Sequence, residues 1–295
     1  MFNPNFSLSR SGGDNERFTR RVATSRFSGT IGVKFWKLEA SGNDFILLDN
    51  RDNRYAGLET VAKKLCRRRI SVGADGLLVM EKARGYHFRM RIFNSDGSEA
   101  EMCGNGSRCI AFFAAREKIA PPSRIFFSTL AGKIEAAVSG KNVRVKLPAP
   151  SGYKKMNVKA GGRDIRVSFV NTGVPHAVLT LNKIDKIDVT ALGSIIRKHR
   201  VFHPAGTNAD FVQVLGRKRI RVRTYERGVE GETLSCGTGS VASAYVLWKE
   251  GRTGSPVLVE TRGEILRVDI KSEEEVWLEG KVKLVYEGKI EGRKI

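Results

Sequence analysis

The chain has 295 residues, which is enough for one large domain or two of ordinary size. It contains four cysteines and no CxxC pair, which argues against a disulfide framework and against a cysteine-rich zinc module. No stretch approaches the roughly 18 consecutive apolar residues that cross a bilayer, so the sequence predicts a soluble protein without a membrane segment.

The formal net charge of +21 allows nucleic acid, an anionic membrane surface or merely a basic surface. Lys and Arg occur in short scattered runs with carboxylates between most of them, and no helix-turn-helix, RNP or zinc-finger pattern accompanies them. We therefore do not expect nucleic-acid binding as the primary role. The cysteine motifs described below predict a small-molecule substrate instead. A basic nucleic-acid-binding protein with an inert enzyme-like fold remains the alternative from another class.

The first 32 residues differ from the rest of the chain. Residues 1–32 are rich in Ser, Gly and Arg and show no apolar periodicity, so they are predicted to form a disordered basic extension. The sharper alternative is a transit peptide, although such peptides are usually poorer in acidic residues. The sequence thus predicts a cytoplasmic protein, with targeting to an organelle through this extension as the alternative.

From Val33 onward, short alternating runs of apolar and polar residues predict strands. The clearest runs are 34–38, 45–48, 88–93, 143–147 and 220–225. Segments 107–119 and 240–249 carry helix-like apolar spacing instead, and each follows a glycine-rich turn. A last alternating run at 281–289 predicts another strand.

A linker signal, Pro148 to Gly152, divides the chain in the middle. We predict a first domain at 34–148 and a second domain at 149–281. The last residues, about 282–295, are predicted to return and complete the sheet of the first domain.

An internal repeat is the central feature of the sequence. A strand, an acidic loop, the motif Cys-Gly-x-Gly-Ser and a helix occur twice, with Cys103 and Cys236 133 residues apart. A looser echo links residues 42–45 to residues 207–211. Two similar half-structures that face each other would bring the two cysteine motifs together across a cleft.

A cysteine directly before a helix lies where free N–H groups and the helix dipole favour the thiolate. The glycines let a ligand approach the backbone, whose N–H groups can hold a carboxylate. Two such sites predict inversion at a carbon α to a carboxylate. One thiolate removes the proton from one face, the opposite thiol delivers a proton to the other, and the helix N-termini stabilise the developing charge. This scheme needs no cofactor and no metal.

Other interpretations of these residues are weaker. Segment 237–242 also fits the dinucleotide pattern GxGxxA, with Glu260 about 20 residues further on, and this is the runner-up for that segment. A cysteine protease has no place for a duplicated cysteine. His199 and His203 lack a third ligand and are expected at the surface rather than on zinc.

Motifs along most of the chain resemble those of one known family. They lie at 37–45, 94–98, 102–106, 173–176, 206–208, 225–228 and 235–239. In this order they resemble diaminopimelate epimerase, and the likeness runs from about residue 34 to about residue 290. The chain departs from many members at Val174, where they carry Asn, and at Gly76, where they carry Gln.

The resemblance implies a cofactor-independent epimerase that interconverts LL- and meso-2,6-diaminopimelate in lysine and peptidoglycan-precursor biosynthesis. It implies an α+β fold of two pseudo-symmetric domains, each a curved mixed or antiparallel sheet wrapped around a central helix, with the site in the cleft between them. The oligomeric state stays open, with a homodimer among the alternatives.

The resemblance also implies residue roles. Cys103 and Cys236 would be the acid/base pair, and His176 and Glu226 would be important for activity. Binding residues would be Gly104, Asn105, Gly237 and Thr238 for the reacting carboxylate, Asn43, Asn94, Asn208 and Arg227 for the distal end, and Glu226 for the distal ammonium. A proline or hydroxyproline racemase-like enzyme is the second hypothesis, because it shares the cysteine pair but has no use for a distal clamp. Cys66 and Cys109 are expected to be packing residues.

Overall fold

The computed structural model describes residues 32–160 and 162–291, so the predicted extension at 1–32 lies outside the described residues except for Gly32. The first half of the molecule comprises β1 (Val33–Ala40), β2 (Asn43–Asp49), α1 (Leu58–Leu65), β3 (Gly76–Glu81), β4 (Phe88–Asn94), β5 (Glu99–Ala100), α2 (Gly104–Arg116), β6 (Ile125–Thr129), β7 (Gly132–Ser139), β8 (Asn142–Leu147) and β18 (Lys283–Ile290). The second half comprises β9 (Ser151–Ala160), β10 (Arg163–Asn171), β11 (Pro175–Thr180), α3 (Val189–Arg197), the 3₁₀ helix η1 (Arg200–Phe202), β12 (Asn208–Gly216), β13 (Arg219–Glu226), β14 (Gly231–Thr233), α4 (Gly237–Lys249), β15 (Val257–Glu260), β16 (Ile265–Ser272) and β17 (Glu275–Lys281).

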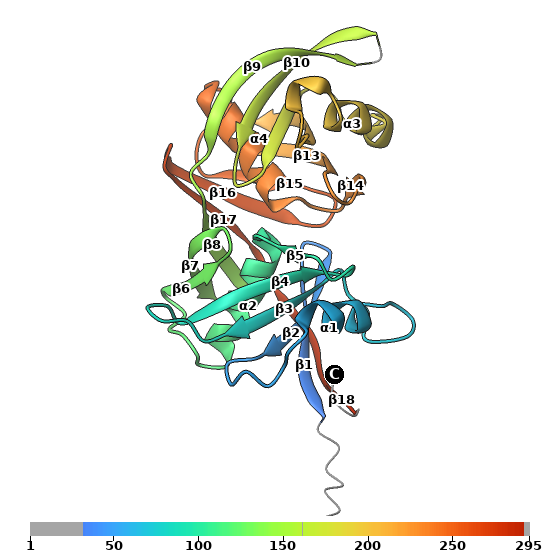
Figure 1. Cartoon of the computed structure of the whole chain (residues 1–295). Coiled ribbons are helices and arrows are strands. Elements are labelled where there is room, and N and C mark those ends of the chain that lie inside the picture. The colour runs from blue at the N-terminus through green and yellow to red at the C-terminus, as the bar shows by residue number, and fades with distance from the viewer. Residues whose placement is uncertain (1–31, 161, 292–295) are drawn as a thin grey trace, which may run out of the picture.

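The predicted α+β architecture of two pseudo-symmetric halves is confirmed (Figure 1). In the first half β2 pairs with β3 in parallel and β4 with β6 in parallel, while the other neighbours are antiparallel. The second half repeats this pattern, with the parallel pairs β11 with β12 and β13 with β15. Element by element, β1 to β8 therefore correspond to β10 to β17, and α2 corresponds to α4.

A pair of ion pairs follows the same repeat. Arg91 on β4 binds both carboxylate oxygens of Glu99 on β5, with N–O distances of 2.7 Å. Arg223 on β13 binds Glu232 on β14 in the same two-point geometry, at 2.7 and 2.8 Å. Bidentate pairs of this kind fix orientation as well as distance. Each therefore holds the acidic loop that leads to a cysteine motif against the strand before it.

The looser sequence echo between residues 42–45 and 207–211 joins segments that are not equivalent in the two halves. Asn43 begins β2, whose counterpart in the second half is β11, whereas Asn208 begins β12, whose counterpart is β3. The strand order and register make Gly76 the counterpart of Asn208, and they make Asn94 at the end of β4 the counterpart of Glu226 at the end of β13. The two similar sequence motifs therefore do not occupy equivalent positions in the two halves.

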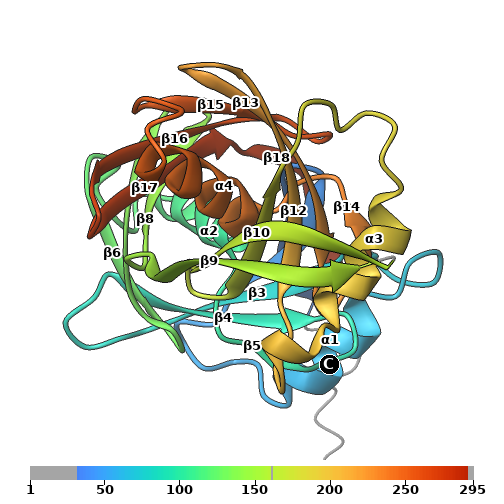
Figure 2. The same cartoon turned by 90° about the horizontal axis from the view of Figure 1, so that it is seen from above.

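Each half wraps its sheet around one buried helix. In α4, residues on all sides of the helix are buried, among them Val241, Ala244 and Leu247. A helix that is apolar all round belongs inside a core. Helix α4 contacts β10, β11, β12, β13 and β16, and Figure 2 shows it enclosed by strands of the second half. Helix α2 contacts β1, β7 and β8 in the same way. The packing thus fixes the positions of the two helix N-termini.

The predicted strands and helices are confirmed, with one difference at the helix boundaries. All five runs and the tail run coincide with β1, β2, β4, β8, β13 and β18. The helices begin earlier than predicted, at Gly104 and Gly237, so the glycine-rich segments form their first turns. Helix α2 ends at Arg116 rather than at residue 119, and Lys118, two residues after its end, has a positive φ of 56°.

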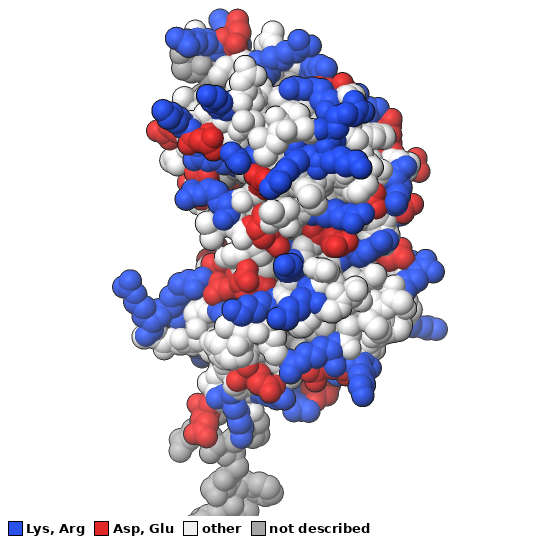
Figure 3. Space-filling view, turned by 180° about the vertical axis from the view of Figure 1, so that it is seen from behind, with Lys and Arg blue, Asp and Glu red and all other residues white. Residues whose placement is uncertain are grey.

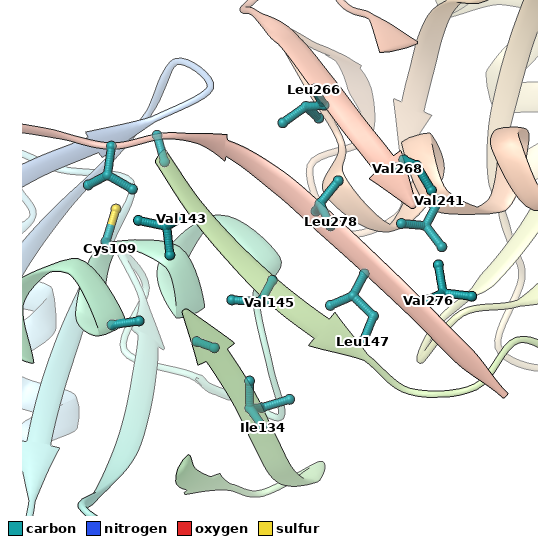
Figure 4. Close-up of a cluster of buried hydrophobic side chains, with 14 of the residues drawn as sticks. Cys109, Ile134, Val143, Val145, Leu147, Val241, Leu266, Val268, Val276 and Leu278 are labelled. Carbon is teal, nitrogen blue, oxygen red and sulfur yellow. The ribbon is translucent and has the colours of Figure 1, made fainter. Parts of the chain in front are cut away.

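The two halves are joined in one continuous sheet by antiparallel pairing of β8 with β17. β18 pairs with β1, and β9 pairs with β10. Because the sheet runs across the linker, the domain division at 148/149 stays a prediction. Figure 4 shows the apolar side chains that pack along this junction, with Leu278 between the two halves.

Replacing Leu278 by alanine is expected to lower the free energy of unfolding by about 3 kcal/mol, because the fully buried side chain would leave a cavity at the junction. Leu258, which is 41% exposed, is the matched control, and its replacement by alanine should cost less than about 0.5 kcal/mol. Urea denaturation of both variants measures the two values. Equal losses would contradict the assignment of Leu278 to the core between the halves.

The outer surface carries both signs of charge. Figure 3 shows Lys and Arg spread over both halves of the rear face, with Asp and Glu between them. Among the described residues, no helix is both long enough and apolar enough to cross a membrane.

Candidate active site

The two repeated cysteines occupy the N-cap positions of the two central helices. Cys103 has an extended backbone (φ −141°, ψ 124°), and its Sγ accepts a hydrogen bond from Gly106 N at 3.5 Å. Cys236 (φ −110°, ψ 113°) accepts from Gly239 N at 3.4 Å in the same way. The thiols thus take the capping role that Ser, Thr, Asp or Asn usually fills. The first N–H groups of each helix have no partner within the helix and stay available to a ligand.

The two helix N-termini converge from opposite halves of the molecule. A Cβ placed on Gly104 would lie 3.6 Å from Leu278 Cδ2, and one on Gly237 would lie 3.0 Å from the same atom. The Cβ on Gly237 would also lie 3.7 Å from the side-chain oxygen of Asn105 on the other helix. Glycine at these positions therefore lets the helix ends approach each other around Leu278.

A cleft of about 950 Å³ opens over the two helix ends. All predicted site residues except His176 line it, namely Asn43, Asn94, Cys103, Gly104, Asn105, Asn208, Glu226, Arg227, Cys236, Gly237 and Thr238. Both positions that depart from the family, Gly76 and Val174, line it as well. The structure thus brings together residues that are up to 195 positions apart in the sequence.

His176 lies behind the wall of the cleft and is fully buried. Its Nδ1 is 2.7 Å from Asp210 Oδ2, and its Nε2 is 3.4 Å from the side-chain nitrogen of Asn208. Asp210 also accepts a hydrogen bond from Thr224 Oγ1 at 2.8 Å. His176 therefore contacts the cleft through Asn208 rather than directly.

Sequence reasoning gave Asp210 no role. A Cβ on Gly239 would collide with Asp210 Oδ1, so the glycine in the first turn of α4 makes room for the buried carboxylate below Cys236. The sequence feature that could have identified Asp210 is its spacing of two residues from Asn208, because residues two apart on a strand point to the same face. Asp210 and Asn208 both lie on β12 and both contact His176.

Ionisable groups surround Cys236. Burial raises the pKa of Glu226, although hydrogen bonds from Thr233 and from the Cys236 thiol act in the opposite direction. Thr233 Oγ1 donates to Glu226 Oε1 at 2.6 Å. Burial, followed by the carboxylates of Glu226 and Asp210, raises the pKa of Cys236 well above its ordinary value. Among the charged groups that act on Cys236, the Glu226 carboxylate has the largest effect on the thiol pKa.

Cys103 has a more neutral environment. Its Sγ lies 4.0 Å from the side-chain oxygen of Asn43, and Asn94 occupies the position that corresponds to Glu226. Burial raises the pKa of Cys103, and the backbone N–H groups of Gly106 and Asn105 only partly offset this. The sequence predicts a position that favours thiolate. That prediction needs correction for both thiols, because burial outweighs the helix N-terminus.

The residues predicted to bind the distal end of the substrate line the same cleft. Arg227 donates its backbone N–H to Asn208 Oδ1 at 2.7 Å, and its guanidinium contacts Ala205 O at 3.3 Å. Within the described residues it forms no ion pair, so its charge is available to a carboxylate. Asn94 and Asn43 are held by Ser98 and Asp75, at 3.0 and 2.8 Å.

Beside Asn43, the carboxylate of Asp44 is tied to two cations. Lys37 Nζ lies 2.7 Å from it and Arg68 Nη2 lies 2.6 Å from it. Burial alone would raise the pKa of Asp44, but these contacts lower it to about 2. The cluster anchors the turn that carries Asn43.

Replacing Asp44 by asparagine is expected to lower the free energy of unfolding by about 2 kcal/mol at pH 7. A folded-state pKa below the unfolded value stabilises the fold above the unfolded pKa, and this contribution is lost as the pH falls toward 2. By the same relation about 1 kcal/mol of it remains at pH 3. Urea unfolding of both proteins at pH 7 and pH 3 tests this, with Asp52→Asn as the exposed control. A difference that does not shrink at pH 3 would contradict it.

The residues named in the alternative sequence interpretations make ordinary structural contacts. Glu260, the acid of the dinucleotide pattern, is bound by Arg221 Nε at 3.0 Å. His199 Nδ1 accepts from Val201 N, and no group of three or more His, Cys, Asp or Glu residues within 32–160 and 162–291 is arranged to hold a metal ion. Cys66 and Cys109 are buried in the core, which confirms the expectation that they are packing residues.

Comparison with known proteins places the chain in a family. The sequence model described as diaminopimelate epimerase matches residues 35–151 and 168–285. A diaminopimelate epimerase from Aquifex aeolicus is 43% identical over 273 residues, covering 88% of this chain and 98% of that protein. Another from Hydrogenobaculum sp. is 45% identical over 268 residues, covering 85% and 96%.

Solved structures share the fold at much lower identity. A phenazine biosynthesis protein of the PhzF family from Bacillus anthracis has a TM-score of 0.69 at 15% identity, covering 88% of this chain and 99% of that one. A probable proline racemase from Agrobacterium radiobacter, with bound carbonate, has a TM-score of 0.66 at 15% identity, covering 88% and 92%. Such likeness shows the architecture alone. The family model, in contrast, matches segments of both halves that include both cysteine motifs, the curated relatives cover most of the chain, and the chain belongs to the diaminopimelate epimerase family.

Proposed function

We propose that the chain interconverts LL-2,6-diaminopimelate and meso-diaminopimelate by acid-base catalysis with Cys103 and Cys236. The observation that carries this proposal is the pair of cysteine N-caps at converging helix ends in one cleft. The relatives from Aquifex aeolicus and Hydrogenobaculum sp., which bear the name of this activity, support the choice of substrate. The reaction would belong to lysine and peptidoglycan-precursor biosynthesis.

In this scheme one cysteine reacts as thiolate and the other as thiol. The thiolate takes the α-proton from one face of the substrate, and the electron pair of the broken C–H bond spreads into the adjacent carboxylate. The opposite thiol then donates its proton to the other face, so the configuration inverts and the two cysteines exchange protonation states. Two bases on opposite faces make inversion possible, whereas one base would return the proton to the face from which it came.

Backbone N–H groups stabilise the intermediate. The N-terminal residues Gly104 and Asn105 of α2, with Gly237 and Thr238 of α4, line the cleft beside the two thiols. Their N–H groups bind the carboxylate whose negative charge grows as the proton leaves. Donors that are already oriented in a largely buried site stabilise such charge more strongly than water does.

Other residues that line the cleft recognise the distal amino acid group. Arg227 binds the distal carboxylate, and Glu226 accepts the distal ammonium. Asn43, Asn94 and Asn208 supply further hydrogen bonds from the cleft wall. His176 supports the wall from behind through Asn208. Glu226 contacts Cys236 as well, so one carboxylate joins substrate recognition to the protonation of a thiol.

Proton NMR of the purified protein with LL-diaminopimelate in D₂O tests the proposal. We expect loss of the α-proton signal and appearance of the meso isomer, with no cofactor added. A Cys103→Ala/Cys236→Ala double variant is the control for background exchange, and proline is the control substrate. No exchange by folded protein with both thiols reduced would contradict the proposal, and exchange of proline alone would indicate the racemase alternative.

A further inference from the structure

A buried charge cluster joins the two halves directly beneath the cleft. Arg108 lies on α2, just over one turn after the Cys103 cap, and its side chain is 0% exposed. Its Nη1 contacts Glu264 Oε1 at 2.9 Å and Lys281 O at 3.2 Å. Its Nη2 contacts Ser41 Oγ at 2.5 Å and Asn105 Oδ1 at 2.8 Å. Arg108 thus reaches two site-forming segments of its own half and a turn of the other half.

Glu264 completes the cluster from the second half. It lies in the turn between β15 and β16, accepts a hydrogen bond from Ser41 Oγ, and accepts another from Lys281 N at 3.1 Å. In the same turn, Gly263 N donates to Leu234 O at 2.8 Å, two residues before Cys236. The turn therefore contacts the segment that leads to one cysteine and, through Ser41, the segment that carries Asn43.

We propose that Arg108 and Glu264 are positioning residues that hold the two cysteine-bearing helix ends in their reactive arrangement. The pair acts through Asn105, whose backbone N–H binds the reacting carboxylate under the proposed function on which this inference rests. It also acts through Ser41 and the 234–236 segment. Neither charged side chain lines the cleft. Both therefore influence the reaction without touching the substrate.

Three observations separate this role from general stabilisation. The residue of α4 in the same place relative to its cysteine is Val241, so a helix in this fold packs well without a charge there. The Arg108 Nε atom has no hydrogen-bond partner among the described residues, and a buried ion pair is in general weak evidence for stability. A Cβ on Gly280 would collide with the guanidinium, so a strand of the junction leaves space for it.

Kinetics of Glu264→Gln and Arg108→Lys test the inference. Glutamine keeps the shape of Glu264 but removes the charge, and lysine keeps the charge of Arg108 but cannot reach Glu264, Ser41 and Asn105 together. We expect kcat to fall at least tenfold in each variant, with a smaller change in KM. The matched control is Glu135→Gln, which removes an exposed Arg–Glu pair of 2.8 Å between Arg124 and Glu135 and should leave kcat unchanged.

A second readout does not depend on the substrate. Alkylation of Cys103 and Cys236 by iodoacetamide, followed by peptide mass spectrometry, should be several-fold faster in Glu264→Gln than in the unchanged protein, with buried Cys109 unlabelled in both. Ser41→Ala, which removes one hydroxyl, serves if the other variants fail to fold, and a smaller change in the same direction is expected. Unchanged kcat and alkylation rates in folded variants would overturn the inference. Absence of turnover in the unchanged protein would instead contradict the proposed function, while the alkylation comparison would still decide the role of the pair.

Discussion

Replacing either Cys103 or Cys236 by alanine is expected to lower kcat for epimerisation by about 10⁴-fold, near the upper end of the contribution of a general acid or base. The scheme uses both thiols in every turnover, one as base and one as acid. Neither loss can be compensated from the same face, because each cysteine is held by its own helix N-terminus from a different half. The interconversion of the two isomers, followed by NMR or by chiral separation, measures the effect.

The remaining cysteines provide a matched control for these variants. Cys66 and Cys109 are buried thiols that belong to the hydrophobic core and do not line the cleft. Cys66→Ala and Cys109→Ala should therefore retain turnover while reporting the cost of removing a buried sulfur. In Cys103→Ala and Cys236→Ala, near-normal inversion by protein that unfolds at an unchanged temperature would contradict the two-base scheme.

The local part of the site could be predicted from the sequence. A cysteine followed by Gly-x-Gly-Ser and an apolar helix is a local pattern, and both copies form N-caps in the structure. The alternating runs at 88–93 and 220–225 are local as well, and they form β4 and β13. Each of these features depends on residues within one or two turns of each other, where spacing alone decides which side chains meet.

The equivalence of residues between the halves could not be predicted in the same way. Asn43 and Asn208 sit in similar short motifs, but they begin strands with different neighbours. The parallel pairings of β2 with β3 and of β11 with β12 bring together segments separated by whole helices. Parallel neighbours require such long connections, so their register is not written in any short motif.

Burial explains why the charge states of the site residues differ from those predicted from the sequence. The placement of a cysteine at a helix N-terminus predicts a lowered thiol pKa, yet burial raises the pKa of both Cys103 and Cys236. Arg108 illustrates the same limit, since a charged residue in a helix is usually exposed, whereas this one is enclosed by partners up to 173 positions away. The environment that sets these charges is assembled by the tertiary fold.

Raised thiol pKa values give Glu226 a specific part in the reaction, and Glu226→Gln should lower kcat/KM by about 10²- to 10³-fold. Glutamine is close in shape and can still accept the hydrogen bond from Thr233, but it can neither take the proton of Cys236 nor pair with an ammonium. Because a partly buried carboxylate with no cationic partner among the described residues is costly, the variant should unfold at an unchanged or higher temperature. Activity would then fall without a loss of stability.

The pH dependence of kcat/KM makes this prediction sharper. Burial raises the pKa of Glu226, so in the unchanged protein activity should rise with pH as this carboxyl group ionises. In Glu226→Gln that limb should disappear, and activity should instead rise only at alkaline pH, where a thiol whose pKa is raised begins to ionise. Glu230→Gln, an exposed change in the same loop, is the control and should keep the original profile. A Glu226→Gln profile that matches the unchanged protein would show that Cys236 loses its proton without this carboxylate, and the ionisation of the thiol would then depend on the substrate.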